Sequence, residues 1–271
     1  MKNSNKIFIL ILSLSLTAGC KKDFLNLAPL DQGSVNLSFR TPDDANRAVL
    51  GIYDITQQNI SDFALLTERT TDNALSQANV GLNNAGGNIR ELIFYQFTSE
   101  NSYMVNMWNN YYKGIAVANQ AIERIEGIAF PNDALKKQYI GEAKFLRAYF
   151  YFNLVRFFGS VPLSLTEIKD PAAAFALTRS PEAEVYEAIS KDLSDAMTAL
   201  PVSYTPANLG RITQGGAKAL LAKVYLTNKK PDLALPLLRQ LTTAPYTYRL
   251  MTTYPRFSQI IRLNLFSKFN I

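Results

Sequence analysis

The stretch Gly141–Gly159 reads GEAKFLRAYFYFNLVRFFG and decides the fold. Most of this stretch belongs to a longer segment, 132–158, in which apolar side chains recur at the three- and four-residue spacing of an α-helix. The apolar face of this segment is so wide that a helix here must be buried on more than one side. Gly159 and Pro162 end the helix. We therefore expect a central helix that other helices cover.

The same helical spacing recurs on both sides of this segment, with recognisable start and stop signals. Thr41 is a predicted N-cap ahead of Pro42, and Ser180 is a predicted N-cap ahead of Pro181. Pro201 is a predicted stop. The predicted helices are 42–58, 103–128, 132–158, 181–200, 214–227 and 231–241.

The last two predicted helices carry their apolar residues in a tetratricopeptide-like arrangement. Small residues let two paired helices approach, and larger ones fill the gap between them. Together with the other helical hairpins, this pair predicts an all-α fold, an α-solenoid-like bundle with long surface loops. The anchors are Leu221, Ala222 and Tyr225 on the first helix and Ala234, Leu238 and Leu241 on the second.

The first residues have the pattern of a bacterial signal peptide, a short basic start ahead of the apolar run Ile7–Leu16. That run is too short to span a bilayer. Cys20, the only cysteine, follows two small residues, although Thr17 stands where an aliphatic residue is usual before a lipidated cysteine. We expect residues 1–19 to be a signal peptide and residues 20–40 to form a lipid anchor and tether. The anchor is expected to carry palmitate on Cys20. The alternatives are an ordinary secretory signal with an incidental cysteine, or a small buried thiol.

The composition excludes several classes of function. With 48% hydrophobic and 18% charged residues, the chain has the composition of a globular protein. The formal net charge of +6 is too small to indicate a nucleic-acid partner, and no basic stripe interleaved with aromatic residues is present. The absence of histidine excludes serine triads and histidine-containing zinc sites. We expect no nucleic acid, no metal and no cofactor.

Between Thr70 and Ser102 the helical spacing fails, and the sequence is rich in Asn, Gly, Ser and Gln. We expect a long surface loop that contains a short extended piece at Leu92–Phe97. Long loops inside compact domains often carry function.

Five sequence motifs follow one another between residue 20 and about residue 250. They are Cys20–Leu25 with Pro29; Trp108–Ile115 with Ala118 and Asn119; Gly141–Gly159 with Val161–Leu163; Arg179–Pro181 with Val185, Tyr186, Ile189, Asp192, Leu193, Leu200 and Pro201; and Gly210–Thr213 ahead of Ala217–Leu226. In this order they resemble the N-terminal half of the SusD/RagB-like nutrient-uptake lipoproteins of Bacteroidetes. The resemblance assigns 41–250 to a SusD-like N-terminal helical domain.

The resemblance implies a lipoprotein that is anchored in the outer membrane and faces the cell exterior. Such a protein binds an oligosaccharide, or in some relatives a peptide, and acts as a lid on a TonB-dependent SusC-like transporter. It binds and does not catalyse. Within the motifs we expect Glu142 and Arg147 to pair or cap in the helical scaffold. We expect Trp108 to be a core residue rather than a platform for ligand.

The resemblance does not locate the binding site, so candidates are chosen by their chemistry. Sugars bind aromatic faces together with planar amides or carboxylates. The loop offers Asp72 and Asn73 as polar candidates, and Tyr95 and Phe97 as stacking candidates. The structural alternative is that the two rings pack into the scaffold while Asp72 and Asn73 close a turn.

The resemblance fades after Tyr248–Met251, and Phe257–Ile271 contains no acidic residue. Members of the family are considerably longer, so we expect 251–271 to be an aberrant tail left by a truncation or frameshift. Two alternatives to glycan binding follow, a tetratricopeptide-type adaptor and a non-functional truncated copy. A glycoside hydrolase would need two opposed carboxylates, and no acidic pair is marked out for that role.

Overall fold

The structure is a computed structural model that describes residues 39–68, 70–71, 87–246 and 248. The predicted signal peptide, Cys20, Asp72, Asn73 and the predicted tail lie outside these residues. The described residues from Thr41 onward belong to one compact unit, as does every element named below.

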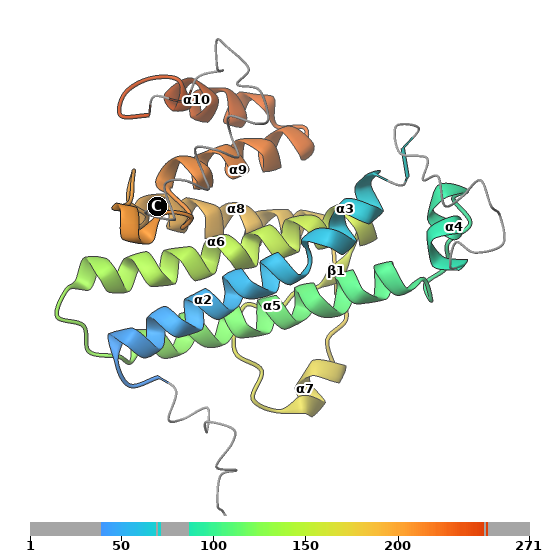
Figure 1. The fold of residues 1–271 in the computed structure, drawn as a ribbon, viewed down its shortest axis with the longest axis horizontal. Helices are drawn as coiled ribbons and strands as arrows, with labels where there is room; N and C mark the ends of the chain where they lie inside the picture. The colour runs from blue at the N-terminus through green and yellow to red at the C-terminus, as the bar shows by residue number, and fades with distance from the viewer. Residues whose placement is uncertain (1–38, 69, 72–86, 247, 249–271) are drawn as a thin grey trace, which may run out of the picture. The chain divides into compact units, whose positions relative to one another are not determined.

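The described part of this unit is almost entirely helical (Figure 1), which confirms the predicted all-α class. Two short strands, β1 (Val161–Pro162) and β2 (Arg179–Ser180), pair antiparallel and bracket the loop that contains α7. The helices are α2 (Pro42–Gln58), α3 (Ile60–Glu68), α4 (Gly87–Ile93), α5 (Ser102–Glu126), α6 (Asp133–Phe158), α7 (Pro171–Phe175), α8 (Glu182–Ala199), α9 (Gln214–Thr227) and α10 (Pro231–Leu241).

Several helix ends are set by capping side chains, of which the sequence analysis predicts Thr41. Thr41 and Asp44 form a capping box at α2, in which the Asp44 amide donates to Thr41 Oγ1 at 3.2 Å and the Thr41 amide donates to Asp44 Oδ2 at 2.8 Å. The side chains of Asn132 and Thr213 cap α6 and α9. Gly159 ends α6 with a φ of 66°, which favours glycine. Local rules are therefore sufficient to place these ends.

Helix α6 lies at the centre of the core, because it packs against both α5 and α8 as well as α2. This arrangement confirms that its wide apolar face is buried on more than one side. Phe150 on α6 is fully buried, and Gly114 on α5 lets the two helices approach. A Cβ added at Gly114 would lie 2.7 Å from Cζ of Phe150. Tyr111 packs on the same ring, with 5.5 Å between the ring centroids.

Helix α9 packs against both α8 and α10, as stacked helical hairpins do. The predicted anchors Ala222 and Ala234 are fully buried, and Leu221 and Leu241 are nearly so. Leu238, however, is 40% exposed, so its prediction as an anchor is wrong. Helical spacing alone does not say which edge of an apolar stripe meets a neighbour.

The prediction of an extended piece at Leu92–Phe97 is also wrong. Residues Gly87–Ile93 form α4, and Leu92 is fully buried in it. Helix α3 follows α2 after the single residue Asn59, and it is not predicted from the sequence. Both helices are short, and a short helix is held by tertiary packing more than by its own sequence.

Ser180 is not the N-cap of α8, contrary to the prediction. Ser180 pairs with Val161 across the two strands, and Pro181 takes the cap position without a side-chain hydrogen bond. Helix α8 then begins at Glu182. Strand pairing with a distant residue therefore overrides the local capping signal.

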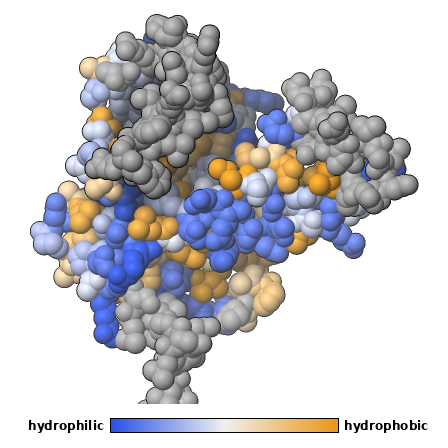
Figure 2. Space-filling model, viewed as in Figure 1, coloured by the Kyte–Doolittle hydropathy of each residue, from blue (hydrophilic) through white to orange (hydrophobic). Residues whose placement is uncertain are grey.

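None of the described helices is both long and apolar enough to cross a membrane. In Figure 2, polar side chains form a band along α2 and α5, and apolar side chains gather near α3, where Ile60 is 67% exposed.

Replacing Gly114 with alanine is expected to lower the free energy of unfolding by about 1–3 kcal/mol, because the new methyl group overlaps the Phe150 ring in a packed core. Gly51→Ala on α2 is the matched control, since nothing lies within 4 Å of a Cβ added there. That substitution is expected to stabilise the chain by about 0.5–1 kcal/mol. Urea unfolding followed by circular dichroism measures both values. Equal changes in the two variants would contradict a tight Gly114–Phe150 contact.

Candidate functional site

The loop 163–178 between the two strands is tied to the helices by polar side chains. Asn119 Nδ2 on α5 donates to the carbonyl oxygens of Ser164 and Thr166, at 3.0 Å each. The Ser164 amide donates to Tyr151 Oη at 2.8 Å, and that hydroxyl donates to the Ser164 carbonyl at 2.9 Å. Burial raises the pKa of Tyr151 to about 12, so its hydroxyl keeps its proton. These bonds fix the loop backbone beside α5 and α6.

Arg147 on α6 connects this loop to α8. Its NH1 donates to the Leu165 carbonyl and to Asn119 Oδ1, at 2.7 Å each. Its Nε and NH2 donate to the two oxygens of Asp192, also at 2.7 Å. Both side chains of this pair are buried, with 5% and 7% exposed. Arg147 therefore has the scaffold role that the sequence predicts, with Asp192 as its partner.

Glu142, the other predicted scaffold residue, is fully buried and pairs with Arg211. Arg211 NH1 donates to both carboxylate oxygens, at 2.9 and 3.1 Å, and Tyr53 Oη donates at 2.8 Å. Burial, with the neighbouring Glu142 charge, raises the pKa of Tyr53. This cluster stabilises the scaffold and lines neither of the two cavities described next.

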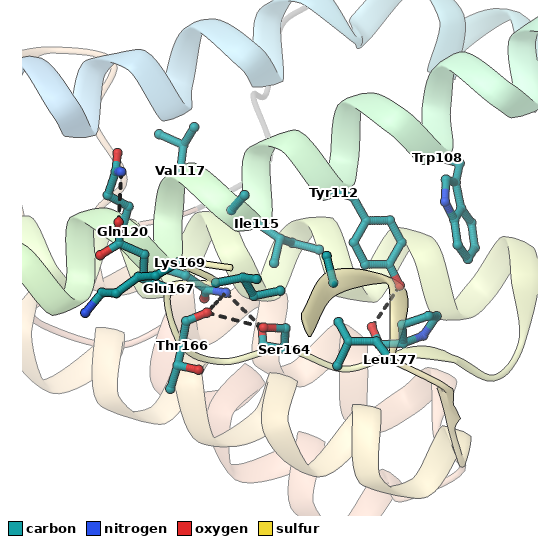
Figure 3. Close-up of a pocket in the computed structure, with 15 residues that line it drawn as sticks. Trp108, Tyr112, Ile115, Val117, Gln120, Ser164, Thr166, Glu167, Lys169 and Leu177 are labelled. Atoms are coloured by element: carbon teal, nitrogen blue, oxygen red, sulfur yellow. Dashed lines mark hydrogen bonds between the residues drawn. The ribbon is translucent and has the colours of Figure 1, made fainter. Parts of the chain in front are cut away.

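A cavity of about 660 Å³ lies between α5 and the loop 163–178, and we call it the loop cavity (Figure 3). Trp108 and Tyr112 on α5 close one end of it. The Tyr112 hydroxyl donates to the Pro162 carbonyl at 2.8 Å. Apolar side chains such as Ile115 and Leu177 line the middle.

An ion pair holds the other end of the loop cavity. Arg124 donates through NH2 and Nε to the two oxygens of Glu167, at 2.7 and 2.9 Å, and Gln120 donates to the same carboxylate at 3.1 Å. The Arg124 hydrogen bonds hold the pKa of Glu167 below its usual value. Glu167 is therefore ionised at neutral pH and is poorly suited to donate a proton.

A second cavity, of about 430 Å³, also has Trp108 in its wall, and we call it the aromatic cavity. Its rings come from Phe97, Trp108, Phe157 and Phe158, and its polar groups from Thr98, Ser99 and Arg179. Rings and hydroxyls together suit a ligand with apolar faces and polar edges.

Trp108, the single tryptophan of the chain, is common to both cavities. Its ring packs edge-to-face against Phe158, with 5.0 Å between centroids, and lies 4.8 Å from the Tyr112 ring. The side chain is half-buried. Trp108 packs against the scaffold, but it is half-buried and presents surface to both cavities, so the prediction of a core residue holds only in part.

Among the predicted ligand-binding residues that the structure describes, Phe97 lines the aromatic cavity and is 38% exposed. Tyr95 lines neither cavity; it is 68% exposed, and its hydroxyl donates to the Thr70 carbonyl. Asp72 and Asn73 lie outside the described residues. A ligand role for each of these four residues stays a prediction.

The other residues of the aromatic cavity are not predicted from the sequence. Thr98 and Ser99 directly follow Phe97, and only their position in the loop 70–102 could have suggested them. Arg179 belongs to a family-like motif, but only the pairing of β1 and β2 brings it to the same cavity.

The described residues contain no cluster of Asp, Glu, His and Cys that could hold a metal ion. Among the described residues that line the two cavities, Glu167 is the one carboxylate. A glycoside hydrolase needs two carboxylates across one cleft. Two carboxylates in this arrangement are not present among the described residues that line either cavity.

Comparison with known proteins assigns the chain to a family. Residues 23–226 match a family model described as "Starch-binding associating with outer membrane". The chain belongs to the SusD-like family. The predicted family is confirmed, and its members by description bind starch and associate with the outer membrane.

Curated SusD-like relatives match the chain over much of its length. SusD-like protein P2 of Formosa agariphila is 30% identical over 226 residues, which cover 82% of this chain and 43% of that protein. A SusD-like protein of Bacteroides ovatus is 27% identical over 235 residues, 82% of this chain and 39% of that protein. The chain thus spans less than half the length of these relatives.

Solved SusD-like structures share the fold. A laminarin binding SusD-like protein superposes with a TM-score of 0.71 at 25% identity, over 79% of this chain and 47% of its own. A SusD-like protein of Bacteroides fragilis gives a TM-score of 0.70 at 28% identity, over 83% of this chain and 42% of its own. The predicted SusD-like helical fold is confirmed.

Asp192→Ala is expected to lower the free energy of unfolding by about 3–5 kcal/mol, because it leaves the buried Arg147 charge unpaired. Asp195→Ala on the same helix is the matched control; Asp195 is 36% exposed and pairs with Lys144 and Lys191. That change is expected to cost at most about 1 kcal/mol. Urea unfolding measures both, and faster hydrogen exchange at the Ser164 amide would report loosening of the loop. Similar costs for the two variants would contradict the scaffold role.

Proposed function

We propose that this protein is a surface lipoprotein that binds glycans and delivers them to a TonB-dependent SusC-like transporter for nutrient uptake. The starch-binding description of its family and the laminarin-binding structural neighbour support a glycan as ligand. The transporter as partner rests on the family resemblance. A peptide ligand is the alternative within the same family.

The aromatic cavity is the ligand site in this proposal. Oligosaccharides present C–H faces that stack on aromatic rings, and hydroxyls that bond to polar groups. Phe97 and Trp108 supply rings, while Thr98 and Ser99 supply hydroxyls. One observation carries the assignment: Phe97, chosen from sequence as a stacking residue, shares its cavity with the single tryptophan. A volume of about 430 Å³ is in the range of small-molecule sites.

The protein binds its ligand without a chemical step in this proposal. Glu167 lines the loop cavity and not the aromatic one. Its carboxylate is held by Arg124, and its lowered pKa suits an ion pair better than proton transfer. Hydrolysis of a bound glycan by the purified chain would overturn this part of the proposal.

Protein binding is the second candidate function. Exposed leucines on α9 and α10 favour it, because apolar patches on tetratricopeptide-like helices are typical of protein contacts. They are Leu226, Leu233, Leu235 and Leu238, each 40–50% exposed. An adaptor of this type would bind another protein through these helices and would bind no glycan.

Phe97→Ala is expected to weaken oligosaccharide binding about tenfold, because it removes one stacking face from the cavity. Phe175→Ala is the matched control, since Phe175 is 90% exposed and lines neither cavity. The fluorescence of Trp108 reports occupancy directly, and titration calorimetry gives the dissociation constant. The ligands are neutral laminarin oligosaccharides, oligogalacturonates and sulfated carrageenan oligosaccharides. If the wild-type chain binds none of them, the adaptor becomes the better proposal.

Cys20 is the lipid attachment site in this proposal and places the protein on the outer membrane, facing the cell exterior. Cys20→Ser is expected to shift the protein from the membrane fraction to the soluble fraction, because stable anchoring needs more than one acyl chain at this site. Ser13→Ala, which keeps the thiol, is the control. Cell fractionation and the intact mass of the mature protein measure the result. A mature protein with an unmodified Cys20 thiol would contradict the anchor.

A further inference from the structure

We propose that the aromatic cavity selects oligosaccharides with an acidic group, a uronate carboxylate or a sulfate ester, and that Arg179 binds this group. The inference rests on the proposed function, because it names the class of glycan for the same cavity.

Arg179 is held at the edge of the cavity by backbone contacts. It lies in β2 opposite Pro162, and its NH1 donates to the carbonyls of Ser160 at 2.8 Å and Phe158 at 3.3 Å. The guanidinium carbon lies 6.0 Å from the centre of the Trp108 ring. The head group is therefore positioned before a ligand arrives, which reduces the entropy lost on binding.

The guanidinium keeps donors available for a ligand. A guanidinium carries five N–H donors in a planar fork that matches the oxygens of a carboxylate or sulfate. In the described part of the chain, Arg179 uses only NH1, and only for backbone carbonyls. Arg124, Arg147 and Arg211 instead each pair with a carboxylate. Arg179 thus binds the scaffold through one nitrogen and is exposed at the cavity.

The charges around the aromatic cavity favour an anion. Arg179 is the one charged residue among the described residues that line it. Glu100, which follows the lining residue Ser99, is exposed, and Glu182 lies beside Gly159, where its Oε1 would be 3.3 Å from an added Cβ. Neither glutamate forms an ion pair with Arg179. A positive group that has no neutralising partner among the described residues, and that lies beside stacking rings, fits an acidic sugar better than a neutral one.

The cavity supplies the remaining contacts that a sugar needs. Phe97 and Trp108 offer faces for the ring of the acidic unit or of its neighbour. Thr98 and Ser99 precede α5 in the chain, whereas Arg179 in β2 follows it, and the first two residues offer hydroxyls to the same cavity. The bond between an acidic group and Arg179 would therefore decide which sugar unit of the oligosaccharide lies at each position of the cavity. The aromatic rings would bind sugar units of any charge.

The first test compares three probes by titration calorimetry on the purified chain: oligogalacturonates, sulfated carrageenan oligosaccharides and neutral laminarin oligosaccharides. At least one acidic probe is expected to bind about tenfold or more tightly than the neutral one. Its affinity is expected to fall as salt is added, while that of the neutral probe changes little. Comparison of the two acidic probes tells carboxylate from sulfate recognition.

The second test changes Arg179. Arg179→Gln is expected to weaken binding of the acidic probe about 10- to 100-fold and to leave binding of the neutral probe within about twofold, because only the charge-assisted bonds are lost. Arg179→Lys keeps the charge but loses the planar fork, so an intermediate loss is expected. Lys191→Gln, which removes an exposed charge on α8, is the matched control. Thermal unfolding by circular dichroism checks that each variant is folded.

The outcomes separate this inference from the proposed function. Equal affinity for neutral and acidic probes, or equal losses for both in Arg179→Gln, would overturn the acidic specificity and leave glycan binding intact. If Arg179→Gln and Lys191→Gln lose the same amount of affinity for the acidic probe, the loss reflects only the net charge of the protein. That result would also overturn the proposed role of Arg179. Failure of all three probes on the wild-type chain would overturn the proposed function together with this inference.

Discussion

The buried pair between Arg147 and Asp192 is the interaction on which the cavity-bearing side of the molecule depends. Neither charge could be buried alone at a tolerable cost, so each requires the other in one fixed geometry. The same guanidinium reaches Asn119 and the Leu165 carbonyl. One side chain therefore sets the position of α5, α6, α8 and the loop 163–178 at once. A hydrophobic pair could join α6 to α8, but it could not bind the loop backbone.

The two cavities follow from this arrangement. The loop cavity exists because the loop 163–178 is held beside α5 by hydrogen bonds to its backbone, which leave apolar side chains facing the space between (Figure 3). The aromatic cavity exists because the pairing of β1 and β2 brings Arg179 close to the end of α6. Trp108 lines both cavities, so its packing against Phe158 both holds the scaffold together and positions a ring in the walls of the cavities.

The sequence predicts those parts of the structure that local chemistry controls. The ends of α2, α9 and α10 are set by Thr41, Thr213 and Pro231, and they lie at the predicted residues. The Ser180 cap fails because strand pairing is a contact between distant residues. For the same reason, the candidate site is predictable only in part. The aromatic side chain of Phe97 can be recognised in the sequence as a stacking group. The approach of Arg179 to Trp108 depends on the tertiary fold.

The fit of Phe150 against Gly114 also bears on how the sequence of this helix pair can change. The Phe150 ring fills the space that the side chain of any residue larger than glycine would need at position 114. The two positions are consequently coupled: a larger residue at one is compatible with the core only after a smaller residue has appeared at the other. Of the two orders of change, shrinking the ring first leaves a cavity, and enlarging the glycine first causes a clash. Evolution between these two packings must therefore pass through an intermediate that is less stable than either.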